Sequence, residues 1–180
     1  IAGQRLLWYS DSMDIPEQAI IVDENDRVVE YRNRRDVGTY DLHRIVAVWI
    51  VNAQGRILLA QRAFSMSNQP GLWGPAAAGT VAKGEGYIET AYRELSEEIG
   101  ISGVTLSQSG KFMTNKPFDE ARMCVVFSGN YDGKTLSLQA DEVAKVRWVD
   151  LADLKQDLTD NPQNYVINMR YVMNCVVNQP

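Results

Sequence analysis

The chain has 180 residues, of which 45% are hydrophobic and 23% are charged, and its net charge is −5. This length and composition are typical of one soluble globular domain that is large enough to bury a good core. The acidic net charge argues against a protein that binds nucleic-acid polymers or anionic membranes through a broad basic surface.

The chain also lacks the patterns of a membrane or secreted protein. The longest uninterrupted apolar run, residues 45–51, is too short to span a bilayer, and the N-terminus lacks the basic-then-apolar layout of a signal peptide. Cys124 and Cys175 have neither the spacing of a disulfide framework nor that of a metal site. We therefore expect a cytoplasmic enzyme with two reduced thiols.

The first half of the chain reads as strands joined by polar turns. Alternating residues on both sides of Asp-Glu-Asn-Asp predict an antiparallel hairpin over residues 18–31. A second strand pair is predicted over residues 44–51 and 56–61, with Asn-Ala-Gln-Gly as its turn. Residues 64–75 are rich in Pro and Gly, which predicts a loop.

The second half combines helices with further strands. Apolar residues recur with helical spacing from 87 to 99, at Ile88, Ala91, Tyr92, Leu95 and Ile99, and Gly100 follows as a helix stop. Strands are predicted over 107–114, 121–131 and 143–149, and a short helix over 150–157 with Asp150 as its N-cap. A closing helix over 162–176 should turn four side chains inward: Tyr165, Met169, Val172 and Met173. This order of elements predicts an α/β sandwich with a mixed sheet.

Three carboxylates share one face of the helix predicted over 87–99. Glu94, Glu97 and Glu98 lie within about 100° of one another around the helix axis, away from the apolar stripe. Like charges at this spacing repel, and a divalent cation that prefers oxygen ligands removes the repulsion. Mg²⁺ or Mn²⁺ bound by these three residues is the functional interpretation. A solvated acidic face is the alternative.

These carboxylates belong to a longer motif, Gly-x5-Glu-x7-Arg-Glu-Leu-x-Glu-Glu-x-Gly-Ile, between Gly79 and Ile101. The motif resembles the Nudix box of hydrolases that cut diphosphate linkages. The resemblance implies an α/β/α sandwich with a mixed central sheet. It also implies a single Nudix domain over residues 1–180, with an N-terminal extension and hairpin at 1–36 and the core at 37–180.

The resemblance also assigns roles within the box. Glu94 is expected to act in catalysis as well as in metal binding, and Arg93 to orient a carboxylate, since it lies four residues after Glu89 and four before Glu97. Structural roles are expected for Gly79, Glu85 and Gly100, and a backbone carbonyl near Ala78 and Gly79 is expected to approach the metal. One more carboxylate is usual in the family as base or extra ligand, for which Glu142 is the first candidate and Glu120 the second. A loop surface role is the alternative for Glu142.

A closer resemblance joins the chain to the Nudix branch that contains type 1 isopentenyl-diphosphate isomerase. The isomerase catalytic groups are replaced, because Ala78 stands in place of a Cys, Thr80 in place of a His and Arg122 in place of a Glu. Cys124, two residues on, is interpreted as a buried small residue, with a displaced catalyst as the alternative. The segments that carry this resemblance are Leu-His-Arg at 42–44, Arg62-Ala63, Pro-Gly-Leu-Trp at 70–73, Asp-Glu-Val at 141–143 and Trp-Val-Asp-Leu at 148–151.

Three further residues have two interpretations each. His43, the single histidine, matches an isomerase metal ligand, but a hydrogen-bonding residue at the start of a strand is favoured. Arg62 matches a diphosphate-binding arginine, with a solvated arginine as the alternative. Trp73 is interpreted as a packing residue, with stacking on a base as the minor alternative.

We conclude from the sequence that the chain is a Mg²⁺- or Mn²⁺-dependent hydrolase of a phosphoanhydride bond. Its expected substrate is a nucleoside diphosphate linked to another moiety, or a related small diphosphate. An isomerase and a non-catalytic Nudix binding module are the alternatives. A homodimer is left open.

Overall fold

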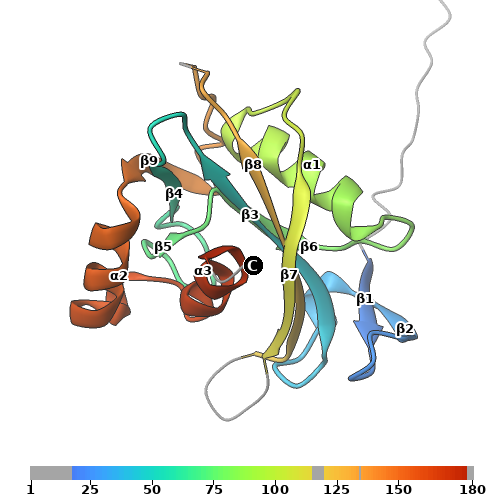
Figure 1. Cartoon of the computed structure of the whole chain (residues 1–180). Helices are drawn as coiled ribbons and strands as arrows, with labels where there is room; N and C mark the ends of the chain where they lie inside the picture. Colours follow the sequence, from blue (N-terminus) through green and yellow to red (C-terminus); the bar gives the residue numbers. More distant parts are fainter. Residues whose placement is uncertain (1–17, 115–119, 134, 178–180) are drawn as a thin grey trace, which may run out of the picture.

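The computed structural model describes residues 18–114, 120–133 and 135–177, and its centre is a mixed β-sheet with helices on both faces (Figure 1). Helix α1 (Tyr87–Ile99) covers one face, and helices α2 (Leu151–Asp160) and α3 (Met169–Val177) lie on the other. The α/β/α sandwich predicted from the sequence is confirmed. No helix among the described residues combines the length and the apolar content needed to cross a bilayer.

Strand β3 (His43–Val51) is the centre of the sheet. It pairs in parallel with β8 (Arg122–Asn130) along its whole length, and antiparallel with β6 (Ala77–Thr80), β4 (Ile57–Arg62) and β1 (Gln18–Val22). The sheet is extended by four outer strands, which are β2 (Val28–Asn33) on β1, β5 (Trp73–Gly74) and β9 (Val143–Val149) on β4, and β7 (Ser107–Thr114) on β8.

Alternation along β3 divides the core into two layers. Val46, Val48 and Ile50 pack with α1 on one face of the sheet. Ile45, Ala47 and Trp49 point to the opposite face and pack with α2 and α3. A strand buried on both faces reads as a continuous apolar run, which is the pattern of residues 45–51.

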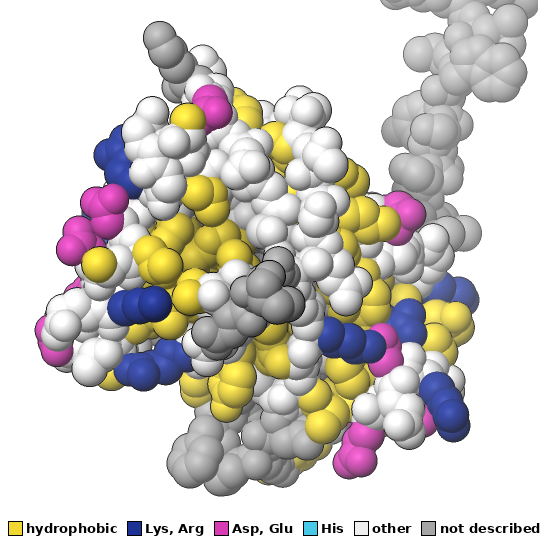
Figure 2. Space-filling model, in the orientation of Figure 1, with side chains coloured by type: hydrophobic (Ala, Val, Ile, Leu, Met, Phe, Trp, Pro, Cys, Tyr) yellow, Lys and Arg dark blue, Asp and Glu magenta, His cyan; other side chains and the backbone are white. Residues whose placement is uncertain are grey.

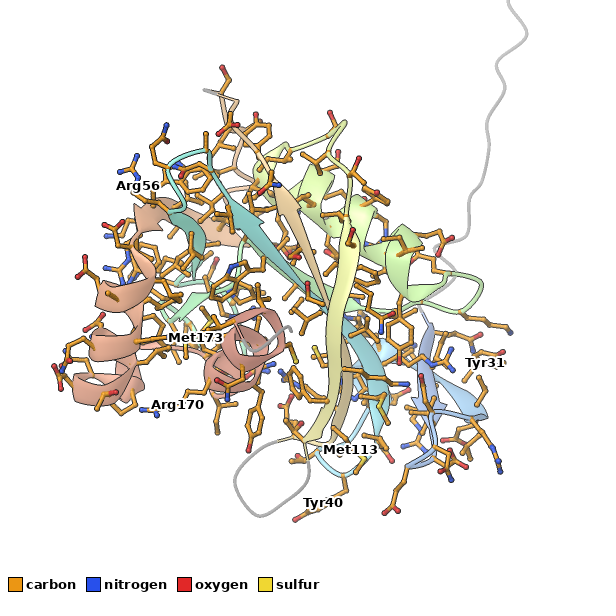
Figure 3. The ribbon with its side chains drawn as sticks, in the orientation of Figure 1. Tyr31, Tyr40, Arg56, Met113, Arg170 and Met173 are labelled. Atoms are coloured by element: carbon orange, nitrogen blue, oxygen red, sulfur yellow. The ribbon has the colours of Figure 1, made fainter. Side chains whose placement is uncertain are left out.

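The N-terminal hairpin forms as predicted. Its turn is held by Asp23, whose Oδ1 accepts hydrogen bonds from the backbone N–H groups of Asn25 and Arg27, each at 2.9 Å. A short helical turn, η1 (Arg34–Asp36), then leads toward β3. The exposed side chains of Tyr31 and Tyr40 project outward from the hairpin and from the loop before β3 (Figure 3).

The prediction of a closing helix over 162–176 is wrong for the first part of this range. A short turn, η2 (Pro162–Asn164), is followed by extended backbone, and α3 begins only at Met169. The extended segment is held because the Val166 N–H donates to the Trp73 carbonyl oxygen at 2.9 Å, which joins it to β5. Tyr165, Met169 and Val172 are nevertheless buried as predicted, and Met173 is partly buried.

Three smaller predictions also need correction. The helical spacing predicts Tyr92 on the apolar stripe of α1, but its side chain is 40% exposed, and its hydroxyl oxygen accepts the Leu106 N–H at 3.1 Å. Asp150 precedes α2 as predicted, but its side chain makes no capping hydrogen bond. The short strands β5 and β6 were not predicted, because the Ala-Ala-Gly-Thr of β6 lacks the alternating apolar pattern of a strand.

Charged side chains of both signs are interspersed around the face drawn in Figure 2, with apolar side chains between them. No histidine appears on this face, which agrees with the burial of His43.

Candidate active site

Three carboxylates converge beside strand β6. Glu94 and Glu98 lie one turn apart on α1 and are both buried, and Glu142 lies just before β9. One carboxylate oxygen from each residue lies within 4.8 Å of the other two. Three carboxylates this close repel one another unless protons or a cation neutralise them. This is the kind of oxygen-ligand cluster that Mg²⁺ and Mn²⁺ prefer.

The backbone of β6 allows α1 to approach this closely. A Cβ atom added at Gly79 would lie 1.9 Å from Oε1 of Glu94, so no other residue fits there without displacing that side chain. The neighbouring Ala78 N–H lies 3.4 Å from Oε1 of Glu98. A glycine is therefore required at position 79, because the Glu94 side chain packs directly against this residue of β6.

Glu142 is brought to α1 by its backbone. The Gln139 N–H donates to the carbonyl oxygen of Glu98 at 2.9 Å, and the Ala63 N–H at the end of β4 donates to the carbonyl oxygen of Glu142 at 2.8 Å. The Gln139 side chain also donates to Oε1 of Glu142 at 3.2 Å. The segment before β9 is thus fixed between the end of α1 and the end of β4.

Burial changes the acidity of the two helix carboxylates. The pKa of Glu94 is raised to about 7, mainly by burial, and the charge of Glu142 acts in the same direction while the Arg93 guanidinium opposes it. Burial also raises the pKa of Glu98 well above its ordinary value, and the charges of Glu94 and Glu142 add to the effect. In the absence of a cation these carboxyl groups therefore retain protons at unusually high pH.

Arg93 joins the loop before α1 to the carboxylates. It donates a fork of hydrogen bonds to Glu85, with Nε 2.9 Å from Oε1 and Nη2 3.1 Å from Oε2. Its Nη1 lies 2.9 Å from Oε1 of Glu94 and 3.0 Å from Oε2 of Glu97. Hydrogen bonding to Arg93 lowers the pKa of Glu85. The main partner of Arg93 is thus Glu85, which helix spacing alone did not indicate.

Glu97 lies outside the group of three carboxylates. Its side chain is 54% exposed, and its carboxylate faces Arg93. A role for Glu97 as a metal ligand stays a prediction.

Gly100 ends α1 in the left-handed conformation, with φ of 73°, and its N–H donates to the Ser96 carbonyl oxygen at 3.1 Å.

Two of the three clustered carboxylates, Glu98 and Glu142, line a cavity of about 1080 Å³. Its lining combines Glu98 and Glu142 with four arginines from three separate segments. Four amide side chains also line it, which makes the cavity strongly polar. The arginines are Arg34, Arg35, Arg62 and Arg122, and the amides are Asn33, Asn68, Gln69 and Asn168. Sequence reasoning identified Arg62 alone among these as a binding residue, because no local pattern joins the others.

Arg62, predicted to bind substrate, is held at the end of β4. Its Nε donates to the Asn68 carbonyl oxygen at 3.0 Å. Burial lowers its pKa, with the charges of Glu98 and Glu142 opposing and those of Arg122 and Arg34 adding to the shift. Arg62 lies between the carboxylates and Arg122, because the next residue, Ala63, donates its N–H to the Glu142 carbonyl oxygen, and Asn68 approaches Glu120, the partner of Arg122.

Glu120, the second candidate for the additional carboxylate, is in a different part of the cavity. It forms an ion pair with Arg122, and Nδ2 of Asn68 lies 3.5 Å from both of its carboxylate oxygens. Of the two candidates, Glu142 is the one that lies with Glu94 and Glu98.

His43 is buried at the start of β3, with Nδ1 2.9 Å from the Asp41 carbonyl oxygen. Burial lowers the pKa of its imidazole, so the ring is neutral near neutral pH and donates from Nδ1. This geometry supports the strand-start interpretation. Among the described residues, His43 is not part of any cluster able to hold a metal ion.

The three positions that replace isomerase catalytic groups all face the cavity. Ala78, Thr80 and Arg122 are among its lining residues, whereas Cys124 is fully buried in the other core layer. Burial also raises the pKa of the Cys124 thiol. Cys124 is therefore a packing residue, and the cavity wall carries no thiol at the described positions.

The comparisons with known proteins agree with this geometry. The NUDIX domain family profile matches residues 41–170. The chain belongs to the Nudix family. It is 32% identical to an isopentenyl-diphosphate Delta-isomerase of Serratia proteamaculans, over 84% of this chain and 86% of that protein. It is also 35% identical to an uncharacterized Nudix hydrolase of Pseudomonas aeruginosa, over 71% of this chain and 75% of that protein.

The fold of this Nudix domain resembles that of the Deinococcus radiodurans protein DR0079. The TM-score is 0.77, and the match covers 88% of this chain and 99% of that one, at 21% sequence identity. This likeness concerns the fold. The relatives in sequence are named both as isomerases and as Nudix hydrolases, so membership of the family alone does not determine the chemistry.

Proposed function

We propose that this Nudix protein is a Mg²⁺- or Mn²⁺-dependent hydrolase of a phosphoanhydride bond in a small diphosphate compound. A nucleoside diphosphate linked to another moiety is one such compound. The observation that carries the proposal is the convergence of Glu94, Glu98 and Glu142, of which Glu98 and Glu142 line a cavity that also contains arginines. Carboxylates suit a cation, and guanidinium groups suit phosphate oxygens.

The donor set fits a hard divalent cation. Glu94 and Glu98 would hold it with buried carboxylate oxygens, and Glu97 would reach it from the exposed side of the helix by exchanging its contact with Arg93. When bound, such a cation neutralises charge on the diphosphate and lowers the pKa of a coordinated water.

The remaining residues have separate roles in this proposal. A carboxylate oxygen of Glu142 accepts the proton of the attacking water, and Gln139 holds that carboxylate in place through its hydrogen bond of 3.2 Å. Arg62 binds a phosphate of the substrate with the nitrogens that Asn68 leaves unused. Arg93 acts as a positioning residue, because it bonds Glu85 and Glu94 at the same time.

The isomerase alternative is not favoured. Carbon protonation and deprotonation need an acid and a base, which Ala78, Thr80 and Arg122 do not supply at the cavity wall. Deuterium uptake from D₂O into isopentenyl diphosphate, followed by NMR, tests this directly. We expect no enzyme-dependent uptake.

A hydrolysis screen tests the proposal and also separates it from a pure binding module. The purified chain would be incubated with nucleotide sugars, dinucleoside polyphosphates, nucleoside triphosphates, coenzymes and isoprenoid diphosphates, with Mg²⁺, Mn²⁺ or a chelator. We expect cleavage of at least one class with metal and none with chelator. Binding of these compounds without any cleavage would overturn the proposal in favour of a binding module.

Three broader inferences accompany this proposal. A cytoplasmic location, a small-molecule partner in place of nucleic acid or membrane, and a division of the domain at residue 37 all stay predictions. Oligomeric state is also untested, and gel filtration with light scattering would distinguish a monomer from a homodimer.

A further inference from the structure

The cavity has two chemically different ends along strand β3. At one end Ala47 pairs with Ala78, whose N–H lies 3.4 Å from the Glu98 carboxylate. At the other end His43 pairs with Arg122. Four residues of strand span about 13 Å. The side chain of Arg122 is therefore attached to the sheet well away from the Glu98 carboxylate, although it lines the same cavity.

The guanidinium of Arg122 has unused hydrogen-bonding capacity. Its side chain is only 13% exposed, and Nη2 is paired with Glu120. Its Nε is buried and has no hydrogen-bond partner in the part of the chain that the structure describes. A buried donor without a partner costs free energy, which an acceptor supplied by a ligand would recover.

Positive charge is in excess over the described lining of the cavity as a whole. The described lining residues include the four arginines and three glutamates, Glu98, Glu120 and Glu142, so their charges sum to at least plus one when His43 is neutral, even with every carboxylate ionised. A divalent cation on the carboxylates adds two positive charges. Such a cavity favours a ligand that carries anionic groups along its length, and a planar guanidinium matches a phosphate with two parallel hydrogen bonds.

No aromatic surface for a nucleobase is present among the described lining residues, none of which is Phe, Tyr or Trp. Trp73 does not contribute one, because its ring packs against Arg147, 4.1 Å from the ring centre, and Lys145, at 5.5 Å. Among the described lining residues, a base-containing substrate therefore has no stacking partner, whereas a second phosphate has Arg122.

We infer that Arg122 binds a second phosphate group of the substrate, beyond the diphosphate that is cleaved, and thereby selects phosphorylated sugar diphosphates over compounds with a base. The inference rests on the proposed hydrolase function. Arg62, between the two ends, binds the diphosphate, and Arg122 binds the phosphate on the far side of the sugar. This makes Arg122 the specificity-determining residue of the cavity.

A comparison of three substrates tests the inference. Phosphoribosyl diphosphate carries a diphosphate, a sugar and a further phosphate. Isopentenyl diphosphate has the diphosphate alone, and ADP-ribose adds a base. We expect the kcat/KM of phosphoribosyl diphosphate to exceed that of each of the other two by at least about tenfold. A preference for ADP-ribose would contradict the inference.

Variants assign the effect to the residue. Arg122→Gln should raise KM for phosphoribosyl diphosphate about tenfold or more and leave KM for isopentenyl diphosphate unchanged. Arg122→Lys keeps the charge but not the fork, so it should restore part of the loss. Arg56→Gln is the matched control, because Arg56 is exposed on the turn before β4, at the edge of the molecule (Figure 3). An equal rise in KM for both substrates in Arg122→Gln would mean a structural role and overturn the inference.

A binding measurement keeps the inference separate from the proposed function. Metal-free wild-type protein titrated with ribose phosphate in a calorimeter should bind it, and Arg122→Gln should not, with a thermal melt to verify folding. If no diphosphate is cleaved but this binding is seen, the hydrolase proposal fails and the phosphate site stands. If ADP-ribose is cleaved and ribose phosphate does not bind, the hydrolase stands and the phosphate site is overturned.

Discussion

The two ends of the cavity are built in different ways. The carboxylate end is largely one continuous segment, in which β6, the loop with Glu85 and helix α1 follow one another in the chain. The arginine end is assembled from η1 and the start of β8, which are far apart in sequence, and the end of β4, with Arg62, lies between the two ends. The first end is defined by local spacing, and the second only by strand pairing. Chemistry carried by one segment can therefore be read from the sequence, while specificity assembled from several segments cannot.

The largest expected effect is at the carboxylate end. Glu98→Gln removes a metal-ligating charge, so we expect hydrolysis of any substrate found by the screen to fall by a factor of about 100 or more. Metal-free stability should stay the same or rise, because repulsion with Glu94 and Glu142 is relieved. Glu89→Gln, an exposed change on the same helix, is the control. Near wild-type turnover in Glu98→Gln would remove the basis for the metal assignment.

A substitution at Gly79 tests whether backbone packing maintains the cluster. Gly79→Ala places a Cβ within 1.9 Å of Oε1 of Glu94. We expect a loss of about 1–3 kcal/mol in the free energy of unfolding and weaker Mg²⁺ binding. Gly74→Ala is the control, since its Cβ would be 3.5 Å from the nearest atom. Denaturant melts and metal titration measure both effects, and equal behaviour of the two variants would argue against this packing role.

The raised pKa values predict a pH dependence that metal should reverse. The pKa of Glu94 rises from its ordinary value of 4.5 to about 7, so the folded state holds more protons than the unfolded state between these values. The resulting stability is complete below pH 4.5 and is lost as the pH rises through about 7. The metal-free melting temperature should therefore decrease over this interval through this contribution.

Mg²⁺ should raise the melting temperature most at the upper end of that interval, where protons no longer compete with it. Glu94→Gln should flatten the pH profile and weaken the response to Mg²⁺. A profile that is identical in wild type and Glu94→Gln would show that Glu94 does not titrate as the structure indicates.

The smallest expected effect concerns the fork between Arg93 and Glu85. The pKa of Glu85 is lowered in the folded protein. The ionised Glu85 carboxylate therefore stabilises the fold at pH values above its ordinary pKa of 4.5, and this stabilisation is lost as the pH falls. Glu85→Gln should cost about 1 kcal/mol near neutral pH and lower turnover less than Glu98→Gln does. Glu89→Gln is again the comparison, with melts at neutral and acidic pH. A Glu85→Gln protein as stable as that control would show that the fork does not hold the loop to α1.

Most of the secondary structure was predictable because its signals are local. Helix α1 matches its predicted limits, 87–99, since an amphipathic repeat is followed by a glycine at φ of 73°. Strand β6 and the late start of α3 were not predictable, because both depend on hydrogen bonds to distant strands, β3 for the former and β5 for the latter. Local patterns carry no information on these partners.

The same distinction holds within the site. The spacing of Glu94 and Glu98 on one helix face indicated their proximity, and Glu142 was the first candidate to join them. Helix spacing paired Arg93 with Glu89 or Glu97, but its fork reaches back to Glu85 across the loop. Arg34 and Arg122 had no signal of their own as binding residues, since they meet only through the fold.

Crystallography with Mn²⁺ tests the central claim most directly, because anomalous scattering locates the ion without any assumption about the substrate. Crystals of the wild-type protein would be soaked in Mn²⁺ and measured for anomalous differences. We predict a peak within coordination distance of carboxylate oxygens of Glu94 and Glu98, with Glu142 or Glu97 beside it. A peak elsewhere in the protein, with none at these residues, would contradict the account.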